Sequence, residues 1–182
     1  MQKRKAAVLA ATGAAGQQFI EALYGHPWFE ITGLYASTRS EGKTYAEAAK
    51  WFSSNPMPAE IAKMKVGDVE KALNDVDRYD VFFSALPSEV SKEMEGKFGA
   101  HKPLISTASG YRYESDVPIL VPEVNAEHAP LIKAQQQARG WKGFVVPGPN
   151  CTTMGLIISL KPIYDRFGIR RVFMTSMQAL SG

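Results

Sequence analysis

The segment KAAVLAATGAAG occupies residues 5–16 and joins an apolar run to a turn that contains two glycines. Residues 5–10 have the composition of a buried β-strand, and residues 15–24 place apolar side chains at helical spacing. Glycines in such a turn allow the backbone to bend sharply and to approach a pyrophosphate, which then lies at the N-terminus of the helix. The segment therefore predicts a strand–turn–helix unit that binds a dinucleotide.

The residues of this turn are the first candidate cofactor contacts. They are Thr12, Gly13, Ala14, Ala15 and Gly16. Ala10 stands where a strict dinucleotide fingerprint has its first glycine, so the pattern is incomplete. A tight turn that binds nothing is the alternative interpretation.

Short apolar runs alternate with helical patterns along the rest of the chain. Further strands are expected at residues 29–35, 63–66, 80–85, 103–106, 118–121, 144–146 and 171–177, and further helices at residues 44–52, 88–98, 126–139 and 152–164. Strands that are separated by helices pair in parallel, because each crossover returns the chain to the same end of the sheet. The predicted fold class is therefore α/β, a Rossmann-like doubly wound and mostly parallel sheet.

Two prolines and a glycine at residues 147–149 mark the expected domain boundary. We expect residues 1–147 to form a nucleotide-binding domain and residues 148–182 to begin an α+β catalytic and dimerisation domain. The sequence ends directly after a strand candidate, which would need neighbours and cover. We therefore expect it to be a piece of a longer chain.

Composition and charge exclude several classes of protein. The chain has 182 residues, 45% hydrophobic and 21% charged, ordinary values for a globular protein that needs no disulfides. The net charge of +3 is scattered, which argues against nucleic-acid binding and fits mild attraction of small anions. The apolar run at residues 6–11 is too short for a secretory signal, and no stretch reaches transmembrane length, so we expect a cytoplasmic protein.

Polar residues after the second and fourth predicted strands extend the candidate cofactor site. An NAD enzyme usually has an acidic residue at the end of its second strand, whereas this chain has Ser37, Thr38, Arg39 and Ser40. Hydroxyl and guanidinium groups suit a 2′-phosphate, so NADP is the predicted cofactor. A solvated polar loop is the alternative. Ser84 is a further candidate contact, and a simple strand-ending turn is its alternative.

Cysteine and histidine are scarce, which makes the position of the one cysteine informative. Cys151 lies in the motif PNCTT ahead of an apolar helical pattern, and a thiol at a helix N-terminus meets the positive end of the helix dipole, which favours the thiolate. Backbone N–H groups in the same turn can hold an oxyanion. A buried structural cysteine is the alternative. The three histidines have no metal-ligand spacing, so we expect no metal site.

A nucleophilic thiol beside NADP predicts a specific chemistry. The thiolate attacks an activated acyl group and forms a thioester, which hydride from the cofactor then reduces to an aldehyde.

Six short motifs make this chemistry more specific. They are residues 11–13 (ATG), 36–40 (ASTRS), 108–112 (ASGYR), 121–125 (VPEVN), 149–153 (PNCTT) and 177–182 (MQALSG). The same motifs in the same order occur in the aspartate-semialdehyde dehydrogenases, so the chain resembles that family, in particular its archaeal and fungal branch. The resemblance runs over the whole chain and covers about the first half of a typical member.

The resemblance implies an enzyme that reduces 4-phospho-L-aspartate with NADPH to L-aspartate 4-semialdehyde and phosphate, in lysine, threonine and methionine biosynthesis. It implies that Cys151 carries the thioester and that Asn150 positions this intermediate. Arg112 would bind the phosphate of the substrate or incoming inorganic phosphate, or else pair on the surface with Glu114 or Asp116. The full-length form is expected to be a homodimer or a homotetramer with a small-molecule acyl phosphate as substrate.

Gln178 would orient the substrate near the thiol, and a strand-end amide that is satisfied by backbone groups is its alternative. Glu123 would contact substrate or a partner subunit, with a purely structural role equally open. The family's general-base histidine and second substrate-binding arginine lie beyond residue 182. We therefore expect the 182-residue chain to bind NADP weakly and to lack turnover on its own. Thr107 departs from the asparagine of many relatives.

Three other functions remain open at this point. Malonyl-CoA reductase resembles an offshoot of the same family that keeps the cysteine thioester, although Asn150 beside Cys151 favours the aspartyl substrate. N-acetyl-glutamyl-phosphate reductase is a more distant relative whose cysteine motif matches less well. A non-catalytic NADP-binding module, with Cys151 as a buried filler, belongs to a different class.

Overall fold

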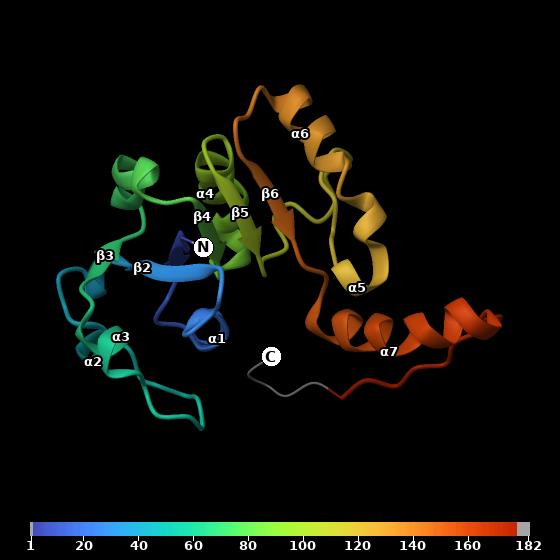
Figure 1. The fold of residues 1–182 in the computed structure, drawn as a ribbon, viewed down its shortest axis with the longest axis horizontal. Coiled ribbons are helices and arrows are strands. Elements are labelled where there is room, and N and C mark those ends of the chain that lie inside the picture. Colours follow the sequence, from blue (N-terminus) through green and yellow to red (C-terminus); the bar gives the residue numbers. More distant parts are fainter. Residues whose placement is uncertain (1, 178–182) are drawn as a thin grey trace.

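The fold is a central parallel β-sheet with helices on both of its faces. The computed structural model describes residues 2–177. Within them, one sheet has the strand order β3-β2-β1-β4-β5-β6, and every neighbouring pair is parallel (Figure 1). The strands are β1 (Arg4–Leu9), β2 (Phe29–Ala36), β3 (Val66–Asp68), β4 (Val81–Ser84), β5 (Pro103–Ser106) and β6 (Phe144–Pro147). This order confirms the predicted Rossmann-like doubly wound class.

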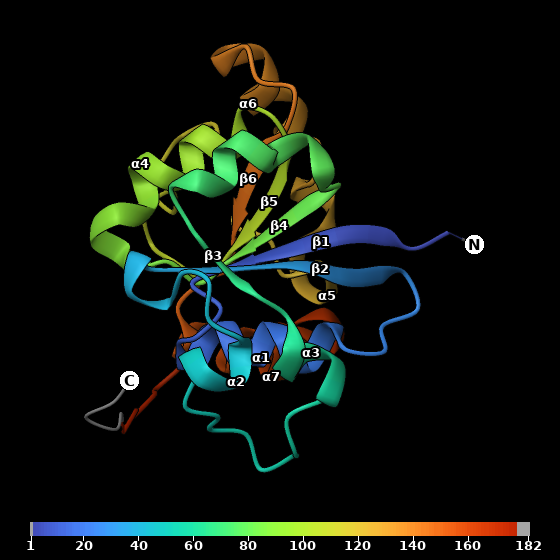
Figure 2. The same cartoon turned by 90° about the vertical axis from the view of Figure 1, so that its left-hand side faces the viewer.

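The helices divide between the two faces of the sheet. The α-helices are α1 (Ala14–Leu23), α2 (Tyr45–Ala48), α3 (Ala59–Lys63), α4 (Ser88–Gly99), α5 (Pro122–Asn125), α6 (Leu131–Arg139) and α7 (Cys151–Phe167). The 3₁₀ helices are η1 (Thr38–Ser40), η2 (Lys71–Arg78) and η3 (Ala126–His128). Figure 2 shows α4 above the sheet and α1, α2 and α3 below it. None of the helices in residues 2–177 combines the length and the hydropathy that crossing a bilayer requires.

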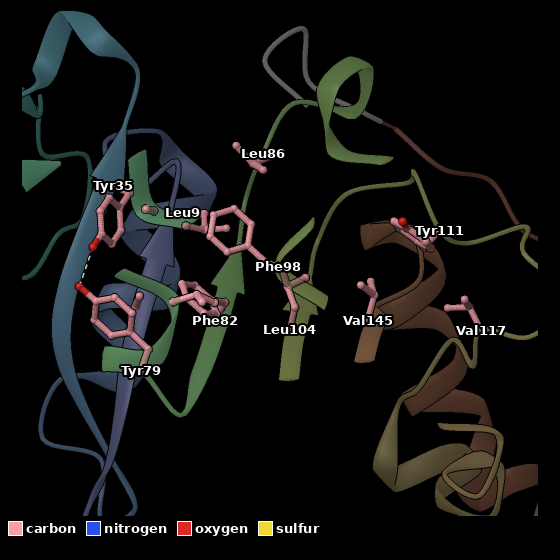
Figure 3. Close-up of a cluster of buried hydrophobic side chains, with 13 residues drawn as sticks. Leu9, Tyr35, Tyr79, Phe82, Leu86, Phe98, Leu104, Tyr111, Val117 and Val145 are labelled. Atoms are coloured by element: carbon pink, nitrogen blue, oxygen red, sulfur yellow. Dashed lines mark hydrogen bonds between the residues drawn. The ribbon is translucent and has the colours of Figure 1, made fainter. Parts of the chain in front are cut away.

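The larger core lies between the sheet and α4 (Figure 3). Phe82, Leu104 and Val145 are fully buried and stand in register on β4, β5 and β6. Phe98 of α4 packs on them, with its ring centroid 4.8 Å from that of Phe82. Burial of each such side chain contributes about 2–3 kcal/mol, so this core fixes α4 over the second half of the sheet.

A second core lies on the opposite face, under α1 and α3. Val8, Leu34 and Val66 are buried in register on β1, β2 and β3, and Ile20 of α1 and Ile61 of α3 cover them. Because Ile20 is anchored here, the N-terminus of α1 is held at the carboxyl end of β1.

Two predicted strands are wrong. Residues 118–121 do not pair with the sheet, because the Asn125 side chain takes up their backbone groups: Val121 N–H donates to its Oδ1 at 2.8 Å, and its Nδ2 donates to the Ile119 carbonyl at 2.9 Å. Residues 171–177 are also not a strand. A strand needs a neighbour's backbone groups, and no strand among the described residues lies beside this segment, which leaves Phe173 exposed.

Three other predicted elements differ most from the observed ones. The helix expected at residues 44–52 is limited to α2. The strand expected at residues 63–66 begins only at Val66, because α3 extends to Lys63 and Lys65 forms an isolated antiparallel bridge with Thr44. The helix expected at residues 126–139 is divided into η3 and α6 around Pro130, which lacks the N–H that a continuous helix would use.

Candidate functional site

A cleft of about 860 Å³ opens at the carboxyl ends of β1, β2, β3 and β4. The strand order reverses between β1 and β4, and ligands of doubly wound sheets bind at this switch point. The cleft is lined by residues 10, 12–16, 36–38, 68–70, 73, 85–87, 90, 93, 94 and 97.

The turn between β1 and α1 contains a strained residue. Ala10 has a φ of +56°, the left-handed region, and among the described residues no other non-glycine residue has a positive φ. This conformation costs an L-residue roughly 1–2 kcal/mol. Ala10 occupies the place of the fingerprint's first glycine, so the chain makes the tight turn with an alanine and retains the strain. The Gly13 N–H donates to the Ala10 carbonyl at 3.2 Å and closes the turn.

Gly16 allows α1 to approach the end of β1. A Cβ atom at this position would lie 2.3 Å from the Ala10 carbonyl oxygen and 2.8 Å from the Ala11 Cα, so no larger residue fits without movement of the backbone. The first turn of α1 consequently lines the cleft. The unpaired backbone N–H groups of a helix N-terminus attract anions, so this wall suits a pyrophosphate.

Two buried side chains hold the turn from behind. The Tyr45 hydroxyl donates to the Ala11 carbonyl at 2.7 Å. The Gln17 side chain donates to the Thr12 carbonyl at 3.0 Å and to the Lys50 carbonyl at 2.8 Å. Tyr45 thus ties the turn to α2, and Gln17 ties it to the segment after α2.

The polar loop at the end of β2 meets the end of β3. Thr38 Oγ1 donates to Asp68 Oδ2 at 2.6 Å, and this bond lowers the pKa of the Asp68 carboxyl. The other oxygen, Oδ1, accepts from the Glu70 N–H at 2.8 Å. Because the Thr38 hydroxyl already donates to Asp68, its proton is not available to a ligand. Ser37 supplies the other hydroxyl group of this cleft wall.

The charged side chains of the cleft do not make it basic. Lys97 is the one cation among the described lining residues, and its Nζ donates to Glu93 at 2.6 Å. Asp68 and Glu70 add negative charge at the opposite wall. An anionic ligand would therefore depend on the backbone N–H groups of α1 more than on side-chain charge.

Cys151 is exposed and begins α7, which follows β6 after the short loop of residues 148–150. Asn150 caps this helix, because its Oδ1 accepts the Thr152 N–H at 3.0 Å, and the Cys151 Sγ lies 4.0 Å from the same oxygen. The carboxyl end of β6 is on the same edge of the parallel sheet as the cleft. Cys151 is not among the residues that line the cleft.

Arg112 fixes the loop ahead of Cys151. Its Nε donates to the Gly148 carbonyl at 2.9 Å, and its Nη2 donates to the Thr107 carbonyl at 2.7 Å and to the Pro149 carbonyl at 3.4 Å. Three backbone carbonyls from two loops thus converge on one guanidinium. The loop after β5 and the loop after β6 are held together immediately before the cysteine.

The segment that forms the cleft matches a known family. Residues 5–132 match the model for the semialdehyde dehydrogenase, NAD binding domain. The chain belongs to this family. The aspartate-semialdehyde dehydrogenase of Methanothermobacter thermautotrophicus is 48% identical over 176 residues, which cover 96% of this chain and 50% of that protein. The malonyl CoA reductase (NADP) of Metallosphaera sedula is 38% identical, over 98% of this chain and 49% of that protein.

A solved structure agrees with this semialdehyde dehydrogenase assignment. The crystal structure of aspartate semialdehyde dehydrogenase with NADP from Candida albicans is 40% identical and superposes with a TM-score of 0.80, covering 92% of this chain and 48% of that one. The matches confirm the resemblance to aspartate-semialdehyde dehydrogenases that the six motifs indicate. The chain spans about half the length of the relatives it matches.

The structure of this semialdehyde dehydrogenase domain brings together most of the predicted cofactor residues. Seven of the ten line the cleft, namely those of the turn together with Ser37 and Thr38. Arg39 and Ser40 follow them in η1 but do not line the cleft. Gln178 lies outside the described residues.

Two expectations about side chains are corrected. Ser84 is fully buried and donates its hydroxyl to Glu95 at 2.6 Å, so this hydroxyl does not line the cleft. The surface ion pair considered as the alternative for Arg112 is absent from the described residues, because Asp116 pairs with Arg139 and Glu114 pairs with Arg139 and Lys92. Arg112 binds backbone carbonyls instead.

Part of the cleft wall comes from residues that the sequence patterns do not mark as functional. Asp68 ends β3, whereas the pattern predicts a strand at residues 63–66 and so places the carboxyl end of this strand two residues too early. Val90, Met94 and Lys97 line the cleft from one face of α4. Their spacing of four and three residues is the available signal, because positions three and four apart share a helix face.

Proposed function

We propose that the cleft binds NADP and that the protein containing this chain is an NADP-dependent aspartate-semialdehyde dehydrogenase. The observation that carries the proposal is the exposed Cys151 at the N-terminus of α7, on the same edge of the sheet as the cleft. The family match and the relative solved with NADP support the choice of cofactor.

Different loops of the cleft would bind different parts of the cofactor. The turn at residues 12–16 would hold the pyrophosphate at the N-terminus of α1. The loop with Ser37, Thr38, Arg39 and Ser40 would hold the 2′-phosphate. Within it the Ser37 hydroxyl lines the cleft, and the Arg39 guanidinium would have to turn toward the phosphate when the cofactor binds. NADPH, when bound, supplies the hydride for the reaction.

The thiol would supply the covalent step. The Cys151 thiolate attacks the carbonyl carbon of the acyl phosphate, a C–S bond forms, and the C–O bond to phosphate breaks with loss of phosphate. After hydride reaches the thioester carbon, the C–S bond breaks and the thiolate is restored with release of the aldehyde. The first backbone N–H groups of α7 would stabilise the oxyanions of both steps.

Asn150 and Arg112 would position the substrate. The Asn150 Oδ1 is held by the Thr152 N–H, so its amide group is fixed beside the sulfur and can donate through Nδ2 to the acyl group. Arg112 is fixed through Nε and Nη2, and among residues 2–177 its Nη1 makes no hydrogen bond. That group would bind the phosphate.

The remaining parts of the proposal concern the whole protein. Residues 1–147 would form the NADP-binding domain and residues 148–182 would begin the catalytic domain, in which Gln178 orients the substrate. The full-length protein would form a homodimer or homotetramer, with small molecules as its other partners. By itself the 182-residue chain would lack turnover.

The function is tested with the full-length protein and three acyl donors, namely 4-phospho-L-aspartate, malonyl-CoA and N-acetyl-glutamyl phosphate. The proposal predicts NADPH oxidation with 4-phospho-L-aspartate and no oxidation in Cys151→Ser. Faster turnover of malonyl-CoA would favour the reductase alternative, which the Metallosphaera sedula relative supports. No NADP binding, or a Cys151 that resists an alkylating reagent in the folded protein, would overturn the proposal and favour a non-catalytic module.

A further inference from the structure

A buried carboxyl group connects the strands that lead to the cleft and to the cysteine loop. Glu95 of α4 is fully buried, and its Oε1 accepts from the Ser84 hydroxyl at 2.6 Å and from the Ser106 hydroxyl at 2.7 Å. Ser84 and Ser106 are register partners at the last positions of β4 and β5. One oxygen atom thus bridges two adjacent strand ends.

The environment of Glu95 favours its neutral form. Burial raises the pKa of the carboxyl group, and the two hydroxyl donors and the nearby Arg112 only partly oppose this effect. Oε2 has no hydrogen-bond partner among the described residues. An unpaired buried polar atom lowers the stability of the fold, so the presence of Glu95 at this position needs an explanation.

The first serine connects Glu95 to the cleft. The Leu86 N–H approaches the Ser84 Oγ at 3.4 Å, and Leu86 is one of the residues that line the cleft. Thr107 is joined to the same strand end, because its N–H donates to the Ser84 carbonyl at 3.0 Å.

The second serine connects Glu95 to the loop that precedes Cys151. The Ala108 N–H donates to the Ser106 Oγ at 2.9 Å, which fixes the start of the loop that ends in Arg112. Arg112 in turn holds the Gly148 and Pro149 carbonyls. The Gly148 N–H also returns to the Ser106 carbonyl at 2.8 Å.

We propose that Glu95 is a positioning residue that holds the ends of β4 and β5 in one frame, and so sets the nucleotide cleft and the Cys151 loop relative to each other. Glu95 touches neither cofactor nor substrate in this role. It acts through Leu86 on the cleft and through Arg112 on the cysteine loop. The cleft part of the inference rests on the proposed NADP binding, whereas the cysteine part does not.

The central test compares Glu95→Leu with Glu95→Gln in the full chain. Leucine removes both acceptor bonds at similar volume, and glutamine keeps a neutral acceptor oxygen. Two quantities are measured, the Kd for NADP⁺ and the rate of Cys151 alkylation by iodoacetamide. We expect each to change about fivefold in Glu95→Leu, the size of one net hydrogen bond, and to return toward wild type in Glu95→Gln. Glu89→Gln, an exposed position of the same helix outside the cleft, is the matched control and should change neither.

Variants of the two serines separate the effect on the cleft from the effect on the cysteine loop. They also replace the first test if Glu95→Leu does not fold. Ser84→Ala should raise the Kd for NADP⁺ with a smaller effect on alkylation, and Ser106→Ala should change alkylation with a smaller effect on the Kd. Folded variants with unchanged Kd and unchanged alkylation rate would overturn the inference. If the wild-type protein bound no NADP⁺, the proposed function would fail, and the alkylation rates of Glu95→Leu and Ser106→Ala would still decide the role of Glu95.

Discussion

Replacing Gly16 by alanine changes the free energy of unfolding in opposite directions according to packing and to helix propensity. Gly16 is the third residue of α1, and replacing a helical glycine by alanine ordinarily stabilises a protein by about 1 kcal/mol. Gly155 of α7 is a matched control, because a Cβ atom there meets nothing within 4 Å. Propensity alone predicts that Gly16→Ala and Gly155→Ala both raise the free energy of unfolding.

The structure predicts opposite signs for the two variants. In Gly16→Ala the new Cβ would lie 2.3 Å from the Ala10 carbonyl oxygen, and contacts below 3.0 Å are essentially never seen, so the helix or the turn must move. The opposing atoms are backbone, which cannot rotate away as a side chain can. Overpacking of this kind costs about 1–3 kcal/mol. With the upper end of that range and the propensity gain, we expect a net loss of about 2 kcal/mol.

Urea unfolding and NADP⁺ titration measure the two consequences. We expect a lower unfolding midpoint at an unchanged m-value for Gly16→Ala, a slightly higher midpoint for Gly155→Ala, and weaker NADP⁺ binding only in the first variant. Stabilisation of Gly16→Ala would refute the close approach of α1 to the turn. Destabilisation with unchanged NADP⁺ affinity would refute the turn as the pyrophosphate site.

Three further predictions concern other parts of the structure. Asn150→Ala removes the α7 cap and should lower the free energy of unfolding by about 1 kcal/mol in urea, and an unchanged midpoint would contradict the cap. Tyr45→Phe leaves the Ala11 carbonyl without its 2.7 Å donor, and a loss of about 1–2 kcal/mol is expected in the same assay; wild-type stability would show that this bond is unimportant. Arg139 donates to both carboxylate oxygens of Asp116 at 2.5 and 2.6 Å and lowers the pKa of this carboxyl group. The ion pair therefore stabilises the fold fully above the ordinary aspartate pKa. This contribution is lost as the pH falls through the lowered pKa of Asp116. Asp116→Asn should therefore destabilise the protein by about 2 kcal/mol at neutral pH and flatten this part of the acid side of its stability profile, and a profile that keeps its wild-type slope would contradict the assignment.

Much of the fold was predictable because its strands are short apolar runs between strong turn signals. The predicted strand at residues 103–106 has the observed bounds, and the tight turn after β1 follows from its glycines. The wrong strands at residues 118–121 and 171–177 have the same composition as the correct ones. What differs is the presence of a neighbouring strand and the competing side chain of Asn125, and neither is visible in local sequence.

The candidate site was predictable where function depends on backbone conformation, and less so where it depends on side-chain partners. Motif and position single out the turn at residues 12–16, which lines the cleft, and Cys151, which is exposed. Ser84 was misjudged because both faces of a parallel sheet are buried, so the sequence does not tell which polar residue meets solvent and which meets Glu95. The bonds of Arg112 to the carbonyls around Gly148 likewise join loops that lie far apart in the sequence.

The most direct measurement of the central claim is a crystal structure of the full-length protein with NADP⁺ and an acyl analogue bound to Cys151. The account predicts that the nicotinamide C4 atom lies within about 3.5 Å of the acyl carbon, the separation that reacting atoms require. A dinucleotide bound outside the cleft, or a nicotinamide that remains separated from the sulfur by intervening protein, would contradict it.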